Sequence, residues 1–531
     1  MSPDVSTTSA STTSARWATR LFTSTRATSP RRAFWYSFVA LFALSTVWAL
    51  ANPLMASVDE PAHVIKAAAT VRGASDVSAD GDATGIGSVE LPQLYEQLAT
   101  YPNCFAFQPN QSAACQQELS GDTDASVVVT TSAINYNPLY YALVGWPALL
   151  PDGEHTVYLM RVLNAALSSA LLGFAVAILA GLRARRWVGI AVLLCLTPTF
   201  VNLMGSVNPQ SVEVTGAVLL WVSLLALLRS PDDRLHTVRL VGVVVSTVFV
   251  ANARGLGPML VVVILVLCIL AAPWHRTVDL FRDRRSWWAL GASVLACVAA
   301  TAWILGADAL PEGSGTVGIS LRENVFRTLG LTSAYVQQLF VALGWLDVGV
   351  PMWVIFLFVS TVAVLVFLAW SAGSWRDRLT IAGTATVTFL MPVLTHAVQA
   401  DKIGYFWQGR YAFPIAIGIV LVAGFALSER DPLPAWFSVN LVATVSTALV
   451  AAQVVVFYSN LHRYASGFEG GWVLTEPLSW SPVPAIGYTV LYAAAWTAAV
   501  VLVGRVALAT GTTALETPVT DEPAGADGAG R

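Results

Sequence analysis

Charged residues are scarce in this chain of 531 residues. Asp, Glu, Lys and Arg make up 11% of it and hydrophobic residues 56%, whereas charged residues form about 25% of an average soluble domain. Apolar runs close to the roughly 20 residues that cross a bilayer recur along most of the length. The sequence therefore predicts an all-α polytopic membrane protein, whose units are membrane spans instead of soluble domains.

Several catalytic and binding motifs are also missing. The sequence contains no GxxxxGK[ST] phosphate loop, no HExxH and no His-rich metal spacing, which argues against an ATP-driven pump and a zinc protease. The net charge of −3, with arginines in short clusters between apolar runs, argues against a nucleic-acid partner. The energy for any reaction would have to come from the substrate itself.

Twelve apolar segments are candidates for membrane spans. The first, residues 34–54, is too long for a signal-peptide core and precedes no convincing cleavage site, so we expect an uncleaved span. The other eleven are residues 157–182, 188–206, 210–229, 239–252, 258–272, 287–306, 351–371, 379–398, 411–428, 436–457 and 485–507. With a cytoplasmic N-terminus, this count places the arginine clusters on the cytoplasmic side, as the positive-inside rule requires.

The two chain ends differ in composition from the membrane domain, which we place at residues 31–508. Residues 1–30 are rich in Ser, Thr, Ala and Arg, and residues 509–531 are rich in Gly, Ala, Pro and acids. Both are predicted to be disordered cytoplasmic tails. The outer face then holds two long loops, residues 55–156 and 307–350, and long loops commonly carry function.

Residues 137–150 are apolar but too short for a span, and Pro147 interrupts them. We expect this segment to lie at the outer surface or to re-enter the membrane. A crossing there would invert the downstream topology and export four arginine clusters.

Only five cysteines are present, and three of them lie inside apolar runs, where cysteine behaves as a small buried hydrophobe. Cys104 and Cys115 lie in the first outer loop, in a compartment where disulfides persist. We expect a disulfide between them, and two free thiols are the alternative.

The first outer loop opens with the stretch SVDEPAHVIKAAA, which starts at Ser57. Ser57 and Glu60 have capping-box spacing, and Asp59 and Glu60 fall in the first turn of the following helix, where the helix dipole favours negative charge. Capping does not account for His63 and Lys66, which share a helix face with Asp59. A carboxylate there can act as a general base, with His63 as its hydrogen-bonding partner or as a metal ligand beside the acids.

Cations and aromatic residues gather in two later stretches. WQGRYAFP holds Gln408, Arg410 and Tyr411 at the outer start of a span, with Lys402 eight residues before Arg410. These side chains suit a phosphate or pyrophosphate head group, and snorkelling to ordinary lipid head groups is the alternative. Arg254 in NARGLGP interrupts an apolar stretch, where a cation faces the protein interior or a watery cavity more readily than lipid.

The acidic motif DE-P-x-H and four later segments are similar to a bacterial membrane-protein family, the domain of unknown function 2142. The later segments are NYNPLYY, SVNPQ, LGWLDVGVP and WQGRYAFP, and all five motifs together span most of residues 34–430. The chain also resembles the GT-C superfamily of membrane glycosyltransferases, which carry an acidic motif just after the first span. This resemblance implies a GT-C-like bundle of about twelve transmembrane helices and a polyprenyl-phosphate-linked sugar as donor.

The resemblance also implies roles for residues at matching positions. Asp59 corresponds to the catalytic acid of the superfamily, and Glu60 is a substitute that the sequence cannot separate from it. Tyr140 and Tyr141 in NYNPLYY would line the sugar site, and anchoring at the membrane interface is the alternative.

SVNPQSVE lies where related enzymes place a second acid, often an aspartate after the proline, and this chain has Gln210 at that position. Asn208 and Gln210 are therefore candidate substrate contacts, as is Lys66 in the first loop. Glu213 lies one turn further on and would compensate for the missing acid, although helix capping is its more ordinary role.

We therefore expect a membrane glycosyltransferase that moves a sugar from a polyprenyl-phosphate donor to an envelope glycan or lipid acceptor on the extracytoplasmic face. Asp59 or Glu60 would take the proton of the acceptor hydroxyl, while Arg410, Lys402 and Arg254 would stabilise the departing phosphate. No cofactor is assigned, and a divalent cation would have to share the same acids. The alternatives are a transporter or flippase for a lipid-linked sugar, with key charges near mid-membrane, and a non-enzymatic envelope assembly protein.

Overall fold

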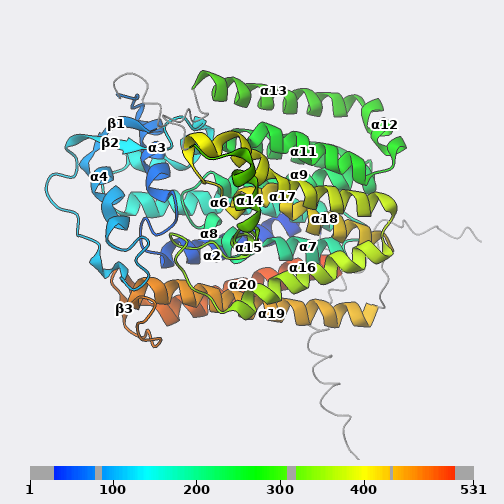
Figure 1. Ribbon diagram of the computed structural model, residues 1–531. Coiled ribbons are helices and arrows are strands. Elements are labelled where there is room, and N and C mark those ends of the chain that lie inside the picture. The colour runs from blue at the N-terminus through cyan, green and yellow to red at the C-terminus, as the bar shows by residue number, and fades with distance from the viewer. Residues whose placement is uncertain (1–28, 78–85, 308–317, 431–434, 509–531) are drawn as a thin grey trace, which may run out of the picture.

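The computed structural model describes residues 29–77, 86–307, 318–430 and 435–508. Long helices lie side by side in one bundle, and most of the connecting structure gathers at one end of it (Figure 1). Nearly all of the two predicted tails lies outside the described residues, and the first helix begins at Pro30.

Ten helices in the described part of the chain are long and apolar enough to cross a membrane. They are α2 (Pro30–Ala51), α6 (His155–Ala180), α9 (Gln210–Arg229), α10 (His236–Ala253), α13 (Arg284–Gly306), α16 (Met352–Ala372), α17 (Trp375–Ile403), α18 (Phe413–Arg430), α19 (Ala435–Ser466) and α20 (Ala485–Leu508). Two bent pairs raise the number of candidate spans to twelve, the number that the sequence predicts. The expected all-α multi-pass membrane protein is confirmed.

The first bent pair joins α7 (Arg186–Cys195) and α8 (Pro198–Met204) at 71°. Pro198 disfavours a helical conformation in the residue before it, and Thr197 caps α8 by accepting a hydrogen bond from the Phe200 amide at 3.4 Å. Gln453 Nε2 donates to the freed Leu196 carbonyl at 2.6 Å. The continuous span expected at residues 188–206 is therefore a broken one.

The second bent pair joins α11 (Gly257–Ala271) and α12 (Trp274–Arg282) at 119°.

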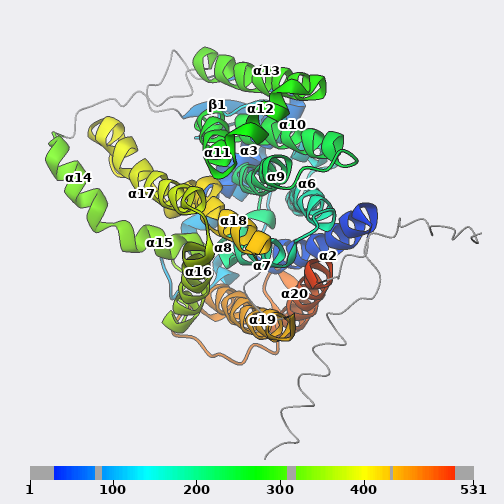
Figure 2. The same cartoon turned by 90° about the vertical axis from the view of Figure 1, so that its right-hand side faces the viewer.

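The centre of the bundle is α9, which is buried along its whole length except at Arg229. Helices α6, α10 and α18 pack around it, and Trp221 on α9 donates to the Pro414 carbonyl of α18 at 2.9 Å. Figure 2 looks along the bundle and shows α9 enclosed, with α13 at the periphery.

One end of the bundle, here called the loop end, is covered by the folded segment between α2 and α6. It contains α3 (Glu60–Arg72), β1 (Gly87–Pro92), α4 (Gln93–Thr100), η1 (Tyr101–Cys104), η2 (Ala113–Cys115), β2 (Ser126–Thr131), α5 (Pro138–Val144) and η3 (Trp146–Leu149). Strands β1 and β2 pair antiparallel, with Val89 opposite Val129. The expected disulfide between Cys104 and Cys115 is present. Helix α5 has seven residues, about 10 Å of rise, and packs on α3, so residues 137–150 do not cross the bundle.

The segment between α13 and α16 contributes α14 (Leu321–Gly330) and α15 (Thr332–Phe340) to the same end. Helix α14 packs on α17 and exposes Phe326. The turn η4 (Gly409–Ala412) precedes α18, and a hairpin of β3 (Pro477–Leu478) and β4 (Ser481–Pro484) precedes α20.

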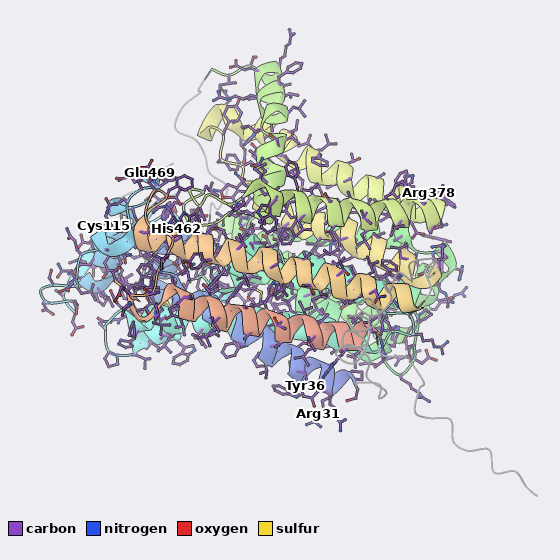
Figure 3. The ribbon with its side chains drawn as sticks, turned by 90° about the horizontal axis from the view of Figure 1, so that it is seen from below. Arg31, Tyr36, Cys115, Arg378, His462 and Glu469 are labelled. Atoms are coloured by element: carbon purple, nitrogen blue, oxygen red, sulfur yellow. A yellow bond between two sulfur atoms is a disulfide. The ribbon has the colours of Figure 1, made fainter. Side chains whose placement is uncertain are left out.

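The opposite end carries the arginine clusters and is called the arginine end. Figure 3 shows Arg31 and Arg378 towards this end, and Cys115 and His462 at the loop end. Here Arg229 pairs with Asp377 at 2.7 Å and with Glu429 at 2.7 Å, which joins α9, α17 and α18.

Candidate active site at the loop end

The backbone separates the two adjacent acids after the first span. Asp59 adopts a left-handed conformation with φ of +67°, and its side chain makes no capping hydrogen bond to α3. The expected capping box of Ser57 and Glu60 is wrong, because both side chains have other partners. Ser57 Oγ donates to Asn202 Oδ1 at 3.3 Å, and Glu60 turns towards α6. The two carboxylates therefore enter different surroundings.

Glu60 is completely buried in a bidentate ion pair with Arg161 of α6. Arg161 Nε and Nη2 donate to the two Glu60 oxygens at 2.7 and 2.6 Å, and the Val207 amide adds a third hydrogen bond at 3.0 Å. The other Arg161 donors reach three carbonyl groups, those of Ala49, Asn52 and Pro53, at 2.8–2.9 Å. This pair fastens α3 to the end of α2, to α6 and to the start of α9, and it leaves neither Glu60 oxygen open.

Asp59 forms the second ion pair, with Arg410 of η4. Its Oδ2 accepts from Arg410 Nη2, and its side chain is 42% exposed while that of Arg410 is 4% exposed. Arg410 Nε donates to Gln408 Oε1 at 2.7 Å, and Nη1 donates to Gln210 Oε1 at 3.0 Å. Gln210 Nε2 returns a bond to the Arg410 carbonyl at 2.7 Å. All three nitrogens of Arg410 are therefore held, whereas no described residue hydrogen-bonds to Asp59 Oδ1.

These surroundings fix the charge states of Asp59 and His63. Burial raises the pKa of the Asp59 carboxyl, but the nearby charges, Arg410 foremost, outweigh it and leave that pKa below its ordinary value. Burial, only partly opposed by Asp59, lowers the pKa of His63 to about 3. His63 Nδ1 lies 2.8 Å from the Tyr141 hydroxyl, and its ring packs edge-on against Tyr136. The site thus pairs an ionised carboxylate with a neutral imidazole.

Arg254 joins the same cluster from the end of α10. Helix α10 has 18 residues, about 27 Å of rise, so Arg254 lies a full helix length away from the arginine end. Its guanidinium stacks on the Tyr411 ring at 4.0 Å, and Arg410 lies over the same ring at 5.3 Å. Glu213 Oε2 is 3.9 Å from Arg254 Nη1 and, among the described residues, is buried without a hydrogen-bond partner. The carboxylate nearest to Arg254 therefore lies at the outer limit of an ion pair, and no hydrogen bond joins the two.

The paired tyrosines are buried and lie behind this cluster. Tyr141 contacts His63, and the Tyr140 hydroxyl donates to Asn164 Oδ1 at 3.0 Å. Asn164 Nδ2 in turn donates to three carbonyl groups, those of Leu203 and Met204 at the end of α8 and that of Ser206 just after it. Neither ring lies at the protein surface, so the interfacial-anchor alternative is wrong for both.

Other predicted site residues take supporting or separate positions. Asn208 Oδ1 accepts the Gln210 amide at 2.9 Å and shapes the start of α9. Lys66 does not join the Asp59 cluster, because its Nζ donates to the Ile134 carbonyl at 2.6 Å. Lys402 belongs to α17, but its side chain lies outside the described residues.

The segment LGWLD, residues 343–347, closes over the site, although the sequence assigned it no role there. The Val58 amide donates to the Gly344 carbonyl at 3.2 Å, and a cavity of about 10 Å³ lies between Val58, Gly344 and Arg410. Gly344 has φ of +59°, and a side chain there would meet Asp347 Oδ1 and the Tyr464 hydroxyl at 2.7 Å. Only glycine fits this position without rearrangement.

Sequence reasoning also passed over Arg161 and Arg463. Arg161 is a charge inside an expected apolar span, and that position is itself a signal of a buried partner. Arg463 lies beyond the expected span 436–457, in the last turn of α19. Arg463 on α19 pairs with Asp347 at 2.6 Å and fixes the LGWLD segment. No group of three or more His, Cys, Asp or Glu side chains able to hold a metal occurs among the described residues.

Comparison with known proteins adds a family and two distant structures. A family model described as "Predicted membrane protein (DUF2142)" matches residues 41–419. Two similar solved structures are crystal structures of ArnT from Cupriavidus metallidurans, one bound to undecaprenyl phosphate and one in the apo state. The first is 14% identical and covers 88% of this chain and 76% of its own, with a TM-score of 0.42. The second is 13% identical and covers 89% and 76%, also with a TM-score of 0.42. Among curated proteins, no sequence matches this chain.

Proposed function

The chain belongs to the DUF2142 family of predicted membrane proteins, and from this premise we propose that it is a glycosyltransferase that uses a polyprenyl-phosphate-linked sugar. The observation that carries the proposal is the state of Asp59. It is an ionised carboxylate, partly open to solvent, that a fully held arginine orients at the loop end. Such a group suits proton abstraction from an acceptor hydroxyl.

The proposed reaction is a single displacement. The acceptor oxygen forms a bond to the anomeric carbon, the bond from that carbon to the phosphate oxygen breaks, and its electron pair leaves with the phosphate. The acceptor proton passes to Asp59 Oδ1, which no described residue occupies. His63, neutral and held by Tyr141, supports the turn that carries Asp59. Glu60 is assigned a positioning role, since both of its oxygens are bound.

Two cations near Asp59 have different proposed roles. Arg410 donates hydrogen bonds to Asp59, Gln210 and Gln408 and therefore orients the Asp59 carboxylate. Arg254 has an aromatic face beneath it and its nearest carboxylate oxygen at 3.9 Å, so it has donor capacity for the phosphate of the lipid. Tyr411 links the two, because both guanidinium groups lie over its ring.

The loop end is placed on the extracytoplasmic side in this proposal. The support is the gathering of arginines at the opposite end, since cytoplasmic loops carry the excess of Lys and Arg. The acceptor would then be an envelope glycan or lipid.

The test compares the lipid-linked sugars and envelope glycans of cells that carry wild type, a deletion, or Asp59→Asn at matched protein levels. Glu96→Gln is the control, because Glu96 is an exposed acid on α4 of the same loop. We expect Asp59→Asn to match the deletion, with one glycan lost and its lipid-linked donor accumulated. An Asp59→Asn strain with the wild-type glycan profile would refute the proposal.

The same cells separate transfer from transport. If the protein transfers sugars, the donor that accumulates in the deletion can be oxidised by a membrane-impermeant reagent added outside. If it moves the lipid-linked sugar across the membrane, the accumulated donor stays protected inside.

A further inference from the structure

A second cavity lies at the far end of α3 from Asp59. Its volume is about 580 Å³, within the roughly 300–1,000 Å³ of small-molecule sites. Helix α3, strands β1 and β2, and η3 contribute to its wall. Arg72, Glu90, Asp124 and Ser126 are among the residues that line it. Figure 1 shows β1 and β2 beside α3 at the loop end.

The charged groups of this cavity leave it acidic. Arg72 is already engaged, with Nη2 at 2.8 Å from Asp152 Oδ1 and Nε donating to the Ala148 carbonyl at 2.9 Å. Asp124 lies beside Asp152, and burial together with this neighbour raises the pKa of Asp152. Glu90 is exposed and has no ion-pair partner in the described part of the chain. Glu90 and Asp124 in the wall, with Asp152 beside them, thus outnumber the one guanidinium, which disfavours an anionic ligand.

The uncharged part of the wall is mixed. Val77 and Leu149 supply exposed apolar surface, while Ser75 and Ser126 supply hydroxyl groups. A ligand that fits must offer hydroxyl or amino donors to the carboxylates and a nonpolar face to the other wall. A sugar ring has both, because its hydroxyls point outwards around a face of C–H groups.

The position of the cavity relates it to Asp59. Helix α3 begins at Glu60 and ends at Arg72, so its 13 residues separate the two places by roughly 18–20 Å along one rigid element. We propose that the cavity binds a neutral or amino-bearing sugar unit of a glycan acceptor whose reacting hydroxyl lies several units away, at Asp59. This inference rests on the proposed function and names its acceptor class as a chain and not a single sugar.

The test measures binding of three tetrasaccharides to the purified full-length protein in lipid nanodiscs, by saturation-transfer NMR and calorimetry. The probes are the glucosamine tetramer, the N-acetylglucosamine tetramer and the galacturonate tetramer. We expect the amino tetramer to bind most tightly, the neutral one more weakly, and the acidic one not at all.

Two variants locate the binding. Glu90→Gln removes an exposed carboxylate and should weaken the amino tetramer about tenfold, as expected for loss of one hydrogen bond to a charged group. Ser126→Trp keeps every charge and fills the cavity, so it should abolish binding of both tetramers. Each variant must keep the thermal unfolding midpoint of wild type. Binding of neither tetramer to wild type, equal binding of the acidic one, or binding that both variants leave unchanged would overturn the proposal.

The Asp59→Asn protein distinguishes this inference from the proposed function. It should bind the tetramers as wild type does while transfer is lost. If Asp59→Asn still transfers sugar, or if the deletion leaves all glycans intact, the proposed function is refuted. The sugar site is retained in either case, provided that tetramer binding still depends on Glu90.

Discussion

Two ion pairs begin at neighbouring residues and end in opposite surroundings. Glu60 and Arg161 are both fully buried, and every oxygen and nitrogen of the pair has a partner. Asp59 and Arg410 combine a buried cation with an acid whose side chain is 42% exposed and has a free oxygen. The left-handed backbone at Asp59 separates them. A closed pair holds elements together, whereas a half-open pair can exchange a proton with a ligand.

The largest expected effect on the fold comes from breaking the closed pair. Glu60→Gln leaves the Arg161 charge buried without its carboxylate, which costs about 3–5 kcal/mol. We expect a lower yield and a lower unfolding midpoint in detergent. Glu60→Leu combined with Arg161→Met should recover much of this loss, because neither charge then remains unpaired. A Glu60→Gln protein as stable as wild type contradicts the structural role.

Breaking the half-open pair should affect the reaction more than the fold. Arg410→Gln removes the cation that lowers the pKa of Asp59, so that pKa rises towards its ordinary value. The acid limb of the transfer rate should then move to higher pH, and the rate at neutral pH should fall by about 10–100-fold as the carboxylate loses its charged hydrogen bond. The pH profile of transfer in isolated membranes measures both. An unshifted acid limb would show that Arg410 does not control Asp59.

A replacement of Arg254 tests which cation meets the phosphate. Arg254→Gln should raise the apparent KM for the lipid donor about tenfold and leave the pH profile in place. The apparent KM of Arg254→Lys should lie between those of wild type and Arg254→Gln, because lysine keeps the charge but not the planar fork. Arg322→Gln, which removes an exposed arginine of α14, is the control for loss of a cation outside the site. If Arg254→Gln and Arg410→Gln shift the pH profile equally, the two arginines do not have the separate roles proposed for them.

The smallest expected effect at neutral pH concerns His63, the neutral neighbour of the half-open pair. Its pKa is about 3 in the folded protein and about 6.5 in an unfolded chain. Between these values the unfolded chain binds the additional proton, so stability falls as the pH is lowered from about 6.5 towards 3. The slope from this residue is at most about 1.4 kcal/mol per pH unit. His63→Gln should flatten the pH dependence of the unfolding midpoint, and an unchanged slope contradicts a buried neutral His63.

Much of the membrane architecture follows from local composition. Apolar runs near 20 residues predict the spans, because each backbone polar group in a bilayer must be satisfied within its own helix. The arginine clusters predict that one end of the bundle differs from the other, and α9 and α18 end at arginines of these clusters, Arg229 and Arg430. The disulfide between Cys104 and Cys115 joins residues only 11 apart, so sequence proximity predicts it well.

Only the tertiary structure decided which of the two adjacent acids is closed by an ion pair and which keeps a free oxygen. DEPAH places Asp59 and Glu60 side by side, and either could serve as a base until α6 supplies Arg161 to one and η4 supplies Arg410 to the other. These partners lie 101 and 351 residues away. Pairing over such separations depends on how the helices pack, since burial sets the cost of an unpaired charge. The sequence determined which residues could carry chemistry, and packing determined which carboxylate stayed open.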